Sequence, residues 1–109
     1  MSEAIQIATT TESQEAATRI ASTLVQQRLA ACVQISGPIT SCYRWQGNLE
    51  TSEEWLCTIK TTAALFRPVE QAIRELHSYD EPEIVATPIV AASQSYLTWL
   101  MEQVDAEHA

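Results

Sequence analysis

The sequence predicts an α+β protein with the ferredoxin-like order βαββαβ, a long β-hairpin and an extra C-terminal helix. One observation is that segments with a two-residue apolar period alternate with segments whose apolar residues recur every three or four positions. A second is the short Gly-containing connection Gln46-Gly47-Asn48, which is typical of a hairpin. A third is the length of 109 residues with no linker-like stretch, so residues 1–109 are predicted to form a single domain.

The first strand and the first helix are predicted from the opening residues. Ile5-Gln6-Ile7 alternates apolar and polar side chains and runs into Thr9-Thr10-Thr11, which predicts a short strand. Thr11 and Gln14 have the spacing of a capping box, which predicts the helix start. The apolar stripe of this helix comprises Ala16, Ala17, Ile20, Ala21, Leu24, Val25 and Leu29. We expect this stripe to cover one face of a sheet.

The second strand leads into the hairpin. Residues 30–35 are predicted to be extended, and Ser36-Gly37-Pro38 marks a bend or bulge because proline donates no ladder hydrogen bond. Residues 40–45 then pair with residues 49–60. Twelve residues of strand span about 40 Å, at about 3.3 Å each. A compact chain of this length is only about 34 Å across. The hairpin is therefore expected to project beyond its own domain.

The second hairpin arm carries apolar side chains on both faces. Trp55, Cys57 and Ile59 alternate with Leu56, so they point to opposite sides of the strand. Because one core cannot cover both sides, we expect copies of the chain to wrap around one another and cover the open sheet face.

A second helix is predicted after Lys60, with Thr61 and Thr62 as candidate N-caps and an end near His77. Pro68 is compatible with this helix only in its first turn. Its apolar stripe comprises Leu65, Phe66, Val69, Ala72, Ile73 and Leu76. Both main helices are expected to pack on one face of the sheet.

The C-terminal part is predicted to contain one strand and one helix. Residues 84–90 form the strand, and Pro88 places part of it at a sheet edge. Residues 93–104 hold apolar side chains at helical spacing.

Charge and composition exclude several classes of partner. The net charge of −8 repels a phosphate backbone, so we predict no nucleic-acid partner. No signal-like start and no run of about 18 apolar residues is found, which predicts a cytoplasmic protein without a membrane partner. The three cysteines, an odd number without a Cys-x-x-Cys pair, are interpreted as buried reduced thiols.

No catalytic constellation is found in the sequence. It contains no Gly-x-Ser-x-Gly elbow, and its two glycines leave no room for a glycine-rich phosphate loop. We therefore predict a non-enzymatic protein that requires no cofactor. An enzyme using Lys60, Tyr79 and Glu83 is the alternative, and it would need a displaced pKa among these groups.

A metal site is one interpretation of the stretch from His77 to Glu83. It concentrates one imidazole and three carboxylates in seven residues, and cysteines offer soft ligands. His77 and Cys32 are the candidate ligands for weak binding of divalent copper or zinc, in a site shared between subunits. The other interpretation is structural, because strong zinc sites use paired ligands a few residues apart.

Two further constellations each have two interpretations. Lys60 ends the long strand and Glu83 precedes the last, so we expect them to approach each other beside Tyr79, in a salt bridge or in a ligand pocket at the subunit boundary. Tyr43 and Trp45 flank Arg44, an arrangement that stacks a planar ligand or anchors an oligomer.

Several separated motifs resemble the CutA divalent-cation tolerance family. They are Leu29-Ala30-Ala31-Cys32-Val33, Ser41, Tyr43-x-Trp45-x-Gly47-x-x-Glu50, Lys60-Thr61 and His77-x-Tyr79-x-x-Pro82-Glu83. They occur in the family's order, and the resemblance runs over about residues 5–104. It implies a ferredoxin-like fold and a homotrimer whose long hairpins cross between subunits.

The resemblance also implies a function. The family is associated with tolerance to copper and other divalent cations, and its trimer is similar to that of the PII signalling proteins, which bind ligands between subunits. The residues carried over to such a cleft are Tyr43, Trp45, Lys60, Tyr79 and Glu83. We therefore predict a homotrimer that binds a divalent metal ion or a small metabolite at these clefts. A PII-like signalling or scaffold protein without direct metal chemistry is the alternative.

Three positions depart from the family pattern. Gln34 stands where the family usually has asparagine, and Ser78 stands where His-Pro-Tyr is common. Residues 91–95 lack the glycine and the acidic residue that many members carry there. The resemblance therefore gives no support for a ligand supplied by residues 91–95.

Overall fold

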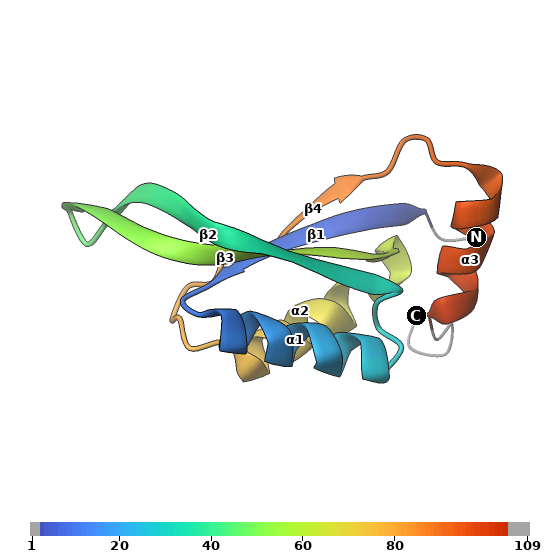
Figure 1. The fold of residues 1–109 in the computed structure, drawn as a ribbon, viewed down its shortest axis with the longest axis horizontal. Helices are drawn as coiled ribbons and strands as arrows, with labels where there is room; N and C mark the ends of the chain where they lie inside the picture. Colours follow the sequence, from blue (N-terminus) through green and yellow to red (C-terminus); the bar gives the residue numbers. More distant parts are fainter. Residues whose placement is uncertain (1–2, 105–109) are drawn as a thin grey trace.

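The structure is a computed structural model that describes residues 3–104. Its elements are β1 (Ala4–Thr11), α1 (Gln14–Gln26), β2 (Cys32–Trp45), β3 (Asn48–Thr62), the 3₁₀ turn η1 (Ala63–Leu65), α2 (Phe66–Leu76), β4 (Val85–Pro88) and α3 (Gln94–Gln103) (Figure 1). The strands form one sheet in the order β2-β3-β1-β4, and every neighbouring pair is antiparallel. This is the ferredoxin-like arrangement with a long hairpin and an added helix, so the predicted fold class is confirmed.

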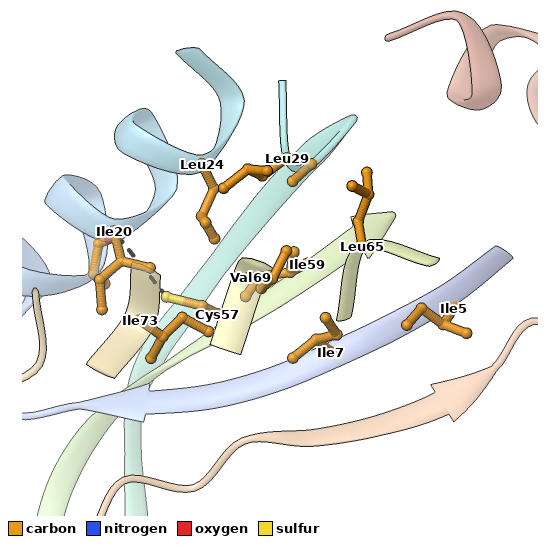
Figure 2. Close-up of a cluster of buried hydrophobic side chains, with 12 residues drawn as sticks. Ile5, Ile7, Ile20, Leu24, Leu29, Cys57, Ile59, Leu65, Val69 and Ile73 are labelled. Carbon is orange, nitrogen blue, oxygen red and sulfur yellow. Dashed lines mark hydrogen bonds between the residues drawn. The ribbon is translucent and has the colours of Figure 1, made fainter. Parts of the chain in front are cut away.

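The core lies between the sheet and the two helices α1 and α2, which pack on the same face (Figure 1). Ile7 on β1 and Ile59 on β3 are paired across the strands and fully buried. They meet Ile20 and Leu24 of α1 and Ile73 of α2, as Figure 2 shows. The predicted helical stripes therefore face the sheet as expected.

Helix α1 begins two residues later than the capping-box pattern predicts. The N-cap is Ser13, whose Oγ accepts a hydrogen bond from the Ala16 backbone N–H at 3.0 Å. Thr11 is unavailable as the cap because it is the last residue of β1, where it pairs with Trp55. Its Oγ1 instead donates to the Ser13 carbonyl at 2.7 Å. The predicted cap at Thr11 is therefore wrong.

The second helical segment starts with the 3₁₀ turn η1 before α2. Thr62 is the N-cap of η1, but its side chain makes no capping hydrogen bond. Pro68 lies in the first turn of α2, and His77 is the C-cap, as predicted. The last strand, β4, is shorter than the predicted 84–90 and lies at the sheet edge. Helix α3 lies within the predicted range.

The β2–β3 hairpin extends past the helices. The molecule measures 44 × 26 × 22 Å, and the hairpin projects at one end of its longest axis (Figure 1). Gln46 and Gly47 form a tight turn with φ of 51° and 84°, the left-handed backbone that suits the twist of a two-residue hairpin. The projection predicted from the strand length is confirmed.

An irregularity interrupts the hairpin pairing between Ser36 and Ile39, where a β-bulge was predicted. The Gly37-Pro38 peptide bond within it is cis. Gly37 packs against the indole of Trp55, and a Cβ at this position would lie 2.7 Å from Trp55 Cδ1. The bulge therefore brings the β2 backbone into direct contact with a side chain of β3.

The alternation predicted for β3 is present on the two faces of the sheet. Trp55, Cys57 and Ile59 all contact the helix-side core, which leaves Leu56 as the apolar group of that segment on the other face. Cross-strand pairing places Lys60 on this open face, where its Nζ donates to Gln34 Oε1 at 2.9 Å. Apart from Val25 on α1, the large exposed apolar side chains of the described residues lie at the hairpin end and from β4 to α3: Tyr43, Trp45, Leu49, Val85, Val90, Tyr96 and Trp99.

Candidate functional site

A pocket of about 600 Å³ lies beside the hairpin, on the sheet face opposite α1 and α2. The hairpin and β1 provide Thr10, Ser41, Cys42, Tyr43, Trp45 and Glu54. The segment between α2 and β4 provides Tyr79, Asp80, Glu81 and Glu83. Figure 1 shows this segment rising from the helix layer past the end of β1. Because the hairpin outreaches the helices, this returning segment can form a second wall.

Glu54 and Tyr79 connect the two walls. The Tyr79 hydroxyl donates to Glu54 Oε2 at 3.0 Å, and Glu54 is only 7% exposed. Burial, followed by the hydrogen bond to Glu54 and its charge, raises the pKa of Tyr79 well above its ordinary range. Tyr79 therefore remains a protonated donor at neutral pH and holds the carboxylate of Glu54 in place.

His77 fixes the start of the same segment. Its Nδ1 accepts a hydrogen bond from the Tyr79 backbone N–H at 3.1 Å, which requires that nitrogen to be unprotonated. The proton is then on Nε2, which donates to the Thr10 carbonyl at 2.7 Å. The imidazole also packs on the Tyr79 ring, with 4.7 Å between centroids. Within one chain, His77 therefore uses both ring nitrogens to attach the segment to β1.

The two candidate metal ligands lie apart in one chain. Cys32 lies level with Gln6 of β1, because both residues pair with Lys60 of β3. His77 contacts Thr10, which is four residues further along β1. Cys32 Sγ lies 3.8 Å from the Tyr96 hydroxyl oxygen, its hydrogen-bond partner. Across residues 3–104, no three side chains of His, Cys, Asp or Glu converge to hold an ion. Metal binding by His77 and Cys32 stays a prediction.

Lys60 does not approach Glu83 within one chain, so that expectation is wrong. Both β3 and β4 run antiparallel to β1, which makes them parallel to each other. The end of β3 and the start of β4 therefore lie at opposite ends of the sheet. Lys60 instead contacts Gln34 and lies 6.0 Å from the centroid of the Tyr96 ring.

The structure gathers four of the five predicted cleft residues around the pocket, namely Tyr43, Trp45, Tyr79 and Glu83. Arg44 is not among the lining residues, and its Nη1 donates to the Gly47 carbonyl at 3.5 Å. Glu54 was missed from the sequence because an acidic residue in a strand is usually exposed. Its place beside Trp55 and Leu56 in an apolar stretch was the signal that could have found it.

The fold and the pocket together define a class of protein, a ferredoxin-like domain with a pocket between an overlong hairpin and the segment after its second main helix. Comparison with known families is more specific. Residues 5–103 match the family described as CutA1 divalent ion tolerance protein, and the chain belongs to this family. The family resemblance predicted from the motifs is confirmed.

Individual relatives agree with this assignment. The chain is 46% identical over 93 residues to the divalent-cation tolerance protein CutA of Thermus thermophilus, covering 85% of this chain and 90% of that one. It is 41% identical to the chloroplastic protein CutA of Arabidopsis thaliana, over 84% of this chain. The match spans only 50% of the plant protein.

Solved structures give the same result. The divalent cation tolerance protein of Thermus thermophilus superposes with a TM-score of 0.91 at 42% identity, covering 94% of this chain and 99% of that one. The structure titled as the periplasmic divalent cation tolerance protein CutA of Archaeoglobus fulgidus superposes with a TM-score of 0.91 at 37% identity, covering 94% and 98%. Relatives thus carry both chloroplastic and periplasmic names. In residues 3–104, no helix combines the length and apolar character needed to cross a membrane.

Proposed function

We propose that this chain acts in divalent-metal-ion tolerance as a homotrimer, without catalysis, by binding a metal ion or a small ligand in clefts between subunits. Membership of a family named for divalent ion tolerance supports the process. The observation that carries the site is the pocket of about 600 Å³. One of its walls is a hairpin that projects past its own helix layer, so a second copy can complete the enclosure.

Two separate apolar surfaces support assembly. One lies at the hairpin end, where Leu49 is 71% exposed and Trp45 is 43% exposed. The other follows β4 and α3, where Val90 is 91% exposed and Trp99 is 41% exposed. Different surfaces that meet head to tail generate a closed ring when the rotation between subunits is right. Lys60 joins the proposed cleft only through such an arrangement, because it lies away from the pocket of its own chain.

Sedimentation velocity tests the assembly. We expect the purified protein to sediment at three times the mass of the 12.1 kDa chain. Leu49→Ala should shift the distribution toward smaller species. The matched control is Val25→Ala, a comparably small truncation of a side chain that is 42% exposed on α1, outside both surfaces. A monomeric wild-type protein at micromolar concentration would refute the trimer.

A growth assay tests the process. A bacterium that lacks its own family member should regain growth in elevated copper when it expresses this chain. The Tyr43→Ala and Tyr79→Phe variants should restore less growth than the Val25→Ala control, because they alter the pocket. Full rescue by a protein that gives no heat when titrated with divalent copper would favour the signalling or scaffold alternative. No rescue by the wild type would refute a role in tolerance.

The cytoplasm is the compartment that we propose. All three cysteines are free thiols, which fits a reducing environment. Cell fractionation of the source organism tests this proposal, and recovery of the protein outside the cytoplasm would refute it.

A further inference from the structure

Within one chain, the pocket contains a buried carboxyl group that pairs with no basic side chain of the described residues. Glu54 is more than nine-tenths buried, and its one side-chain donor in the described chain is the neutral hydroxyl of Tyr79. No lysine or arginine of residues 3–104 pairs with it. The ten lining residues include no basic side chain, whereas Asp80, Glu81 and Glu83 add three carboxylates. A buried charge is costly unless it is paired, so the pocket is electrostatically suited to a cation.

The hairpin wall that carries Glu54 also carries aromatic side chains. Tyr43 and Trp45 both line the pocket, and each keeps 43% of its surface exposed. Because they are two residues apart on one strand, their rings project from the same face. Tyr43 is held by a hydrogen bond of 3.3 Å between its hydroxyl and Ser52 Oγ. Faces of tryptophan and tyrosine attract ammonium groups at about 6 Å from the ring centroid.

The positions of the carboxylates around the pocket distinguish a metal ion from an organic cation. A calcium or magnesium ion needs several oxygens within about 2.0–2.6 Å of one point. Here the acidic residues come from β3 and from separate positions of the returning segment, and no three of them converge in the described residues. Small-molecule sites occupy about 300–1,000 Å³, and this pocket of about 600 Å³ lies within that range. A cation with an organic body therefore fits the pocket better than a bare ion.

We propose that this pocket binds an organic ammonium ion, with Glu54 as its counter-charge and with Tyr43 and Trp45 as its aromatic wall. Tyr79 is a positioning residue, because it holds the Glu54 carboxylate and contributes to the returning wall. This inference rests on the proposed function, since it names the class of small ligand for the same cleft.

Isothermal titration calorimetry of the intact protein with benzyltrimethylammonium chloride tests the inference. This probe combines a permanent positive charge with an aromatic body, and benzyl alcohol is its uncharged counterpart. We expect saturable binding of the ammonium ion below millimolar concentration and binding of the alcohol at least about tenfold weaker. Absence of saturable heat with the ammonium ion, or equal binding of both probes, would overturn the inference.

Matched variants test whether binding of the ammonium ion depends on the carboxylate of Glu54. Glu54→Gln keeps the size of the side chain and an oxygen acceptor for Tyr79 but removes the charge, so affinity should fall by at least about tenfold. Glu75→Gln makes the same substitution on α2, outside the pocket, and should bind as the wild type does. If Glu54→Gln does not fold, Trp45→Leu removes the aromatic face and should weaken binding several-fold. Wild-type affinity for the ammonium ion in a folded Glu54→Gln variant would contradict the role of Glu54. If only Trp45→Leu folds, wild-type affinity in that variant would contradict the role of the aromatic wall.

The test of ammonium binding can fail or succeed independently of the tests of the trimer and of copper tolerance. A protein that sediments as a trimer and restores copper tolerance, but does not bind the ammonium ion, refutes this inference alone. A monomer that binds the ion refutes the trimer and leaves the ligand class standing. A structure of the assembled protein in which a basic side chain from a second copy pairs with Glu54 would also overturn the inference.

Discussion

The two halves of the β2–β3 hairpin share the same strands but differ in what covers them. In the inner half, Cys57 and Ile59 are completely buried beneath α1 and α2. In the outer half, Leu49 is 71% exposed, and Tyr43 and Trp45 are 43% exposed. The irregularity between Ser36 and Ile39 lies close to this boundary. The hairpin thus provides both part of the core and one wall of the pocket, and its inner half is the part buried within its own chain.

The strongest test of this difference is truncation in each half. Ile59→Ala should lower the free energy of unfolding by about 2–5 kcal/mol, because it leaves a cavity in a fully packed core. Leu49→Ala should cost less than half as much, since that side chain leaves no cavity. Urea denaturation at equal protein concentration measures both. Equal losses would show that the outer half is as tightly packed as the inner half.

A substitution at the boundary should have an intermediate effect. Gly37→Ala places a methyl group 2.7 Å from Trp55 Cδ1 and should cost about 1–3 kcal/mol through overpacking. Gly47→Ala, whose Cβ would meet nothing within 4 Å, should cost about 1–2 kcal/mol because its φ of 84° is left-handed. Trp55→Ala should remove most of the Gly37→Ala penalty without changing that of Gly47→Ala. A double-mutant cycle checks this coupling, and additive losses would argue against the contact.

Loss of one hydrogen bond across the pocket should have a smaller effect. Tyr79→Phe removes the donor to Glu54 and should cost about 1 kcal/mol, with faster amide hydrogen exchange in residues 77–83. Tyr96→Phe is the control, because that exposed hydroxyl makes only a 3.8 Å contact to Cys32. Unchanged exchange in residues 77–83 of Tyr79→Phe would mean that the contacts of His77 with Thr10 and of Ser78 with Glu12 hold the segment without Tyr79.

Thiol labelling compares the two halves without changing the fold. The prediction that all three thiols are buried is wrong for Cys42, which is exposed in the outer half and should react first with a thiol reagent at pH 8. Cys57 is buried in the inner half and should react only on unfolding. Burial raises the pKa of Cys57 from 9.0 to about 11, which favours the neutral thiol in the folded protein. The resulting stabilisation is complete below pH 9 and is lost as the pH rises through about 11. Labelling of Cys57 in the native protein would refute its burial, and mass spectrometry of peptides identifies the modified residues.

Local sequence patterns predicted the elements better than their contacts. The apolar periods located both helices and the hairpin, because those patterns report directly on burial. They did not distinguish Thr11 from Ser13 as the helix cap, since both are good cap residues and the choice depends on Thr11 pairing with Trp55. They also placed Lys60 beside Glu83, because strand direction in the sheet was not taken into account. Relative strand direction is a property of the whole topology.

The pocket shows the same division between local and long-range information. Tyr43, Trp45, Tyr79 and Glu83 were selected by resemblance and lie around one pocket. Glu54 was not selected, because its burial depends on a segment 25 residues away in sequence that crosses over it. Whether these residues bind a ligand stays a prediction that the titrations above address.

The extra residue in β2 changes which positions of that strand, odd or even, lie on the open face of the sheet. Before the irregularity, Val33 and Ile35 pack against the helix-side core, and the even-numbered residues of β2 lie opposite the even-numbered residues of β3. Beyond it, the odd-numbered Tyr43 pairs with Glu50, so odd positions now share the face of even ones. Deleting a single residue at this point would join the two registers into one regular ladder, and both rings would stay on the face of Glu54 because cross-strand partners share a face. The irregularity thus allows β2 to be one residue longer than the matching part of β3 while keeping its core contacts at one end and its pocket residues at the other.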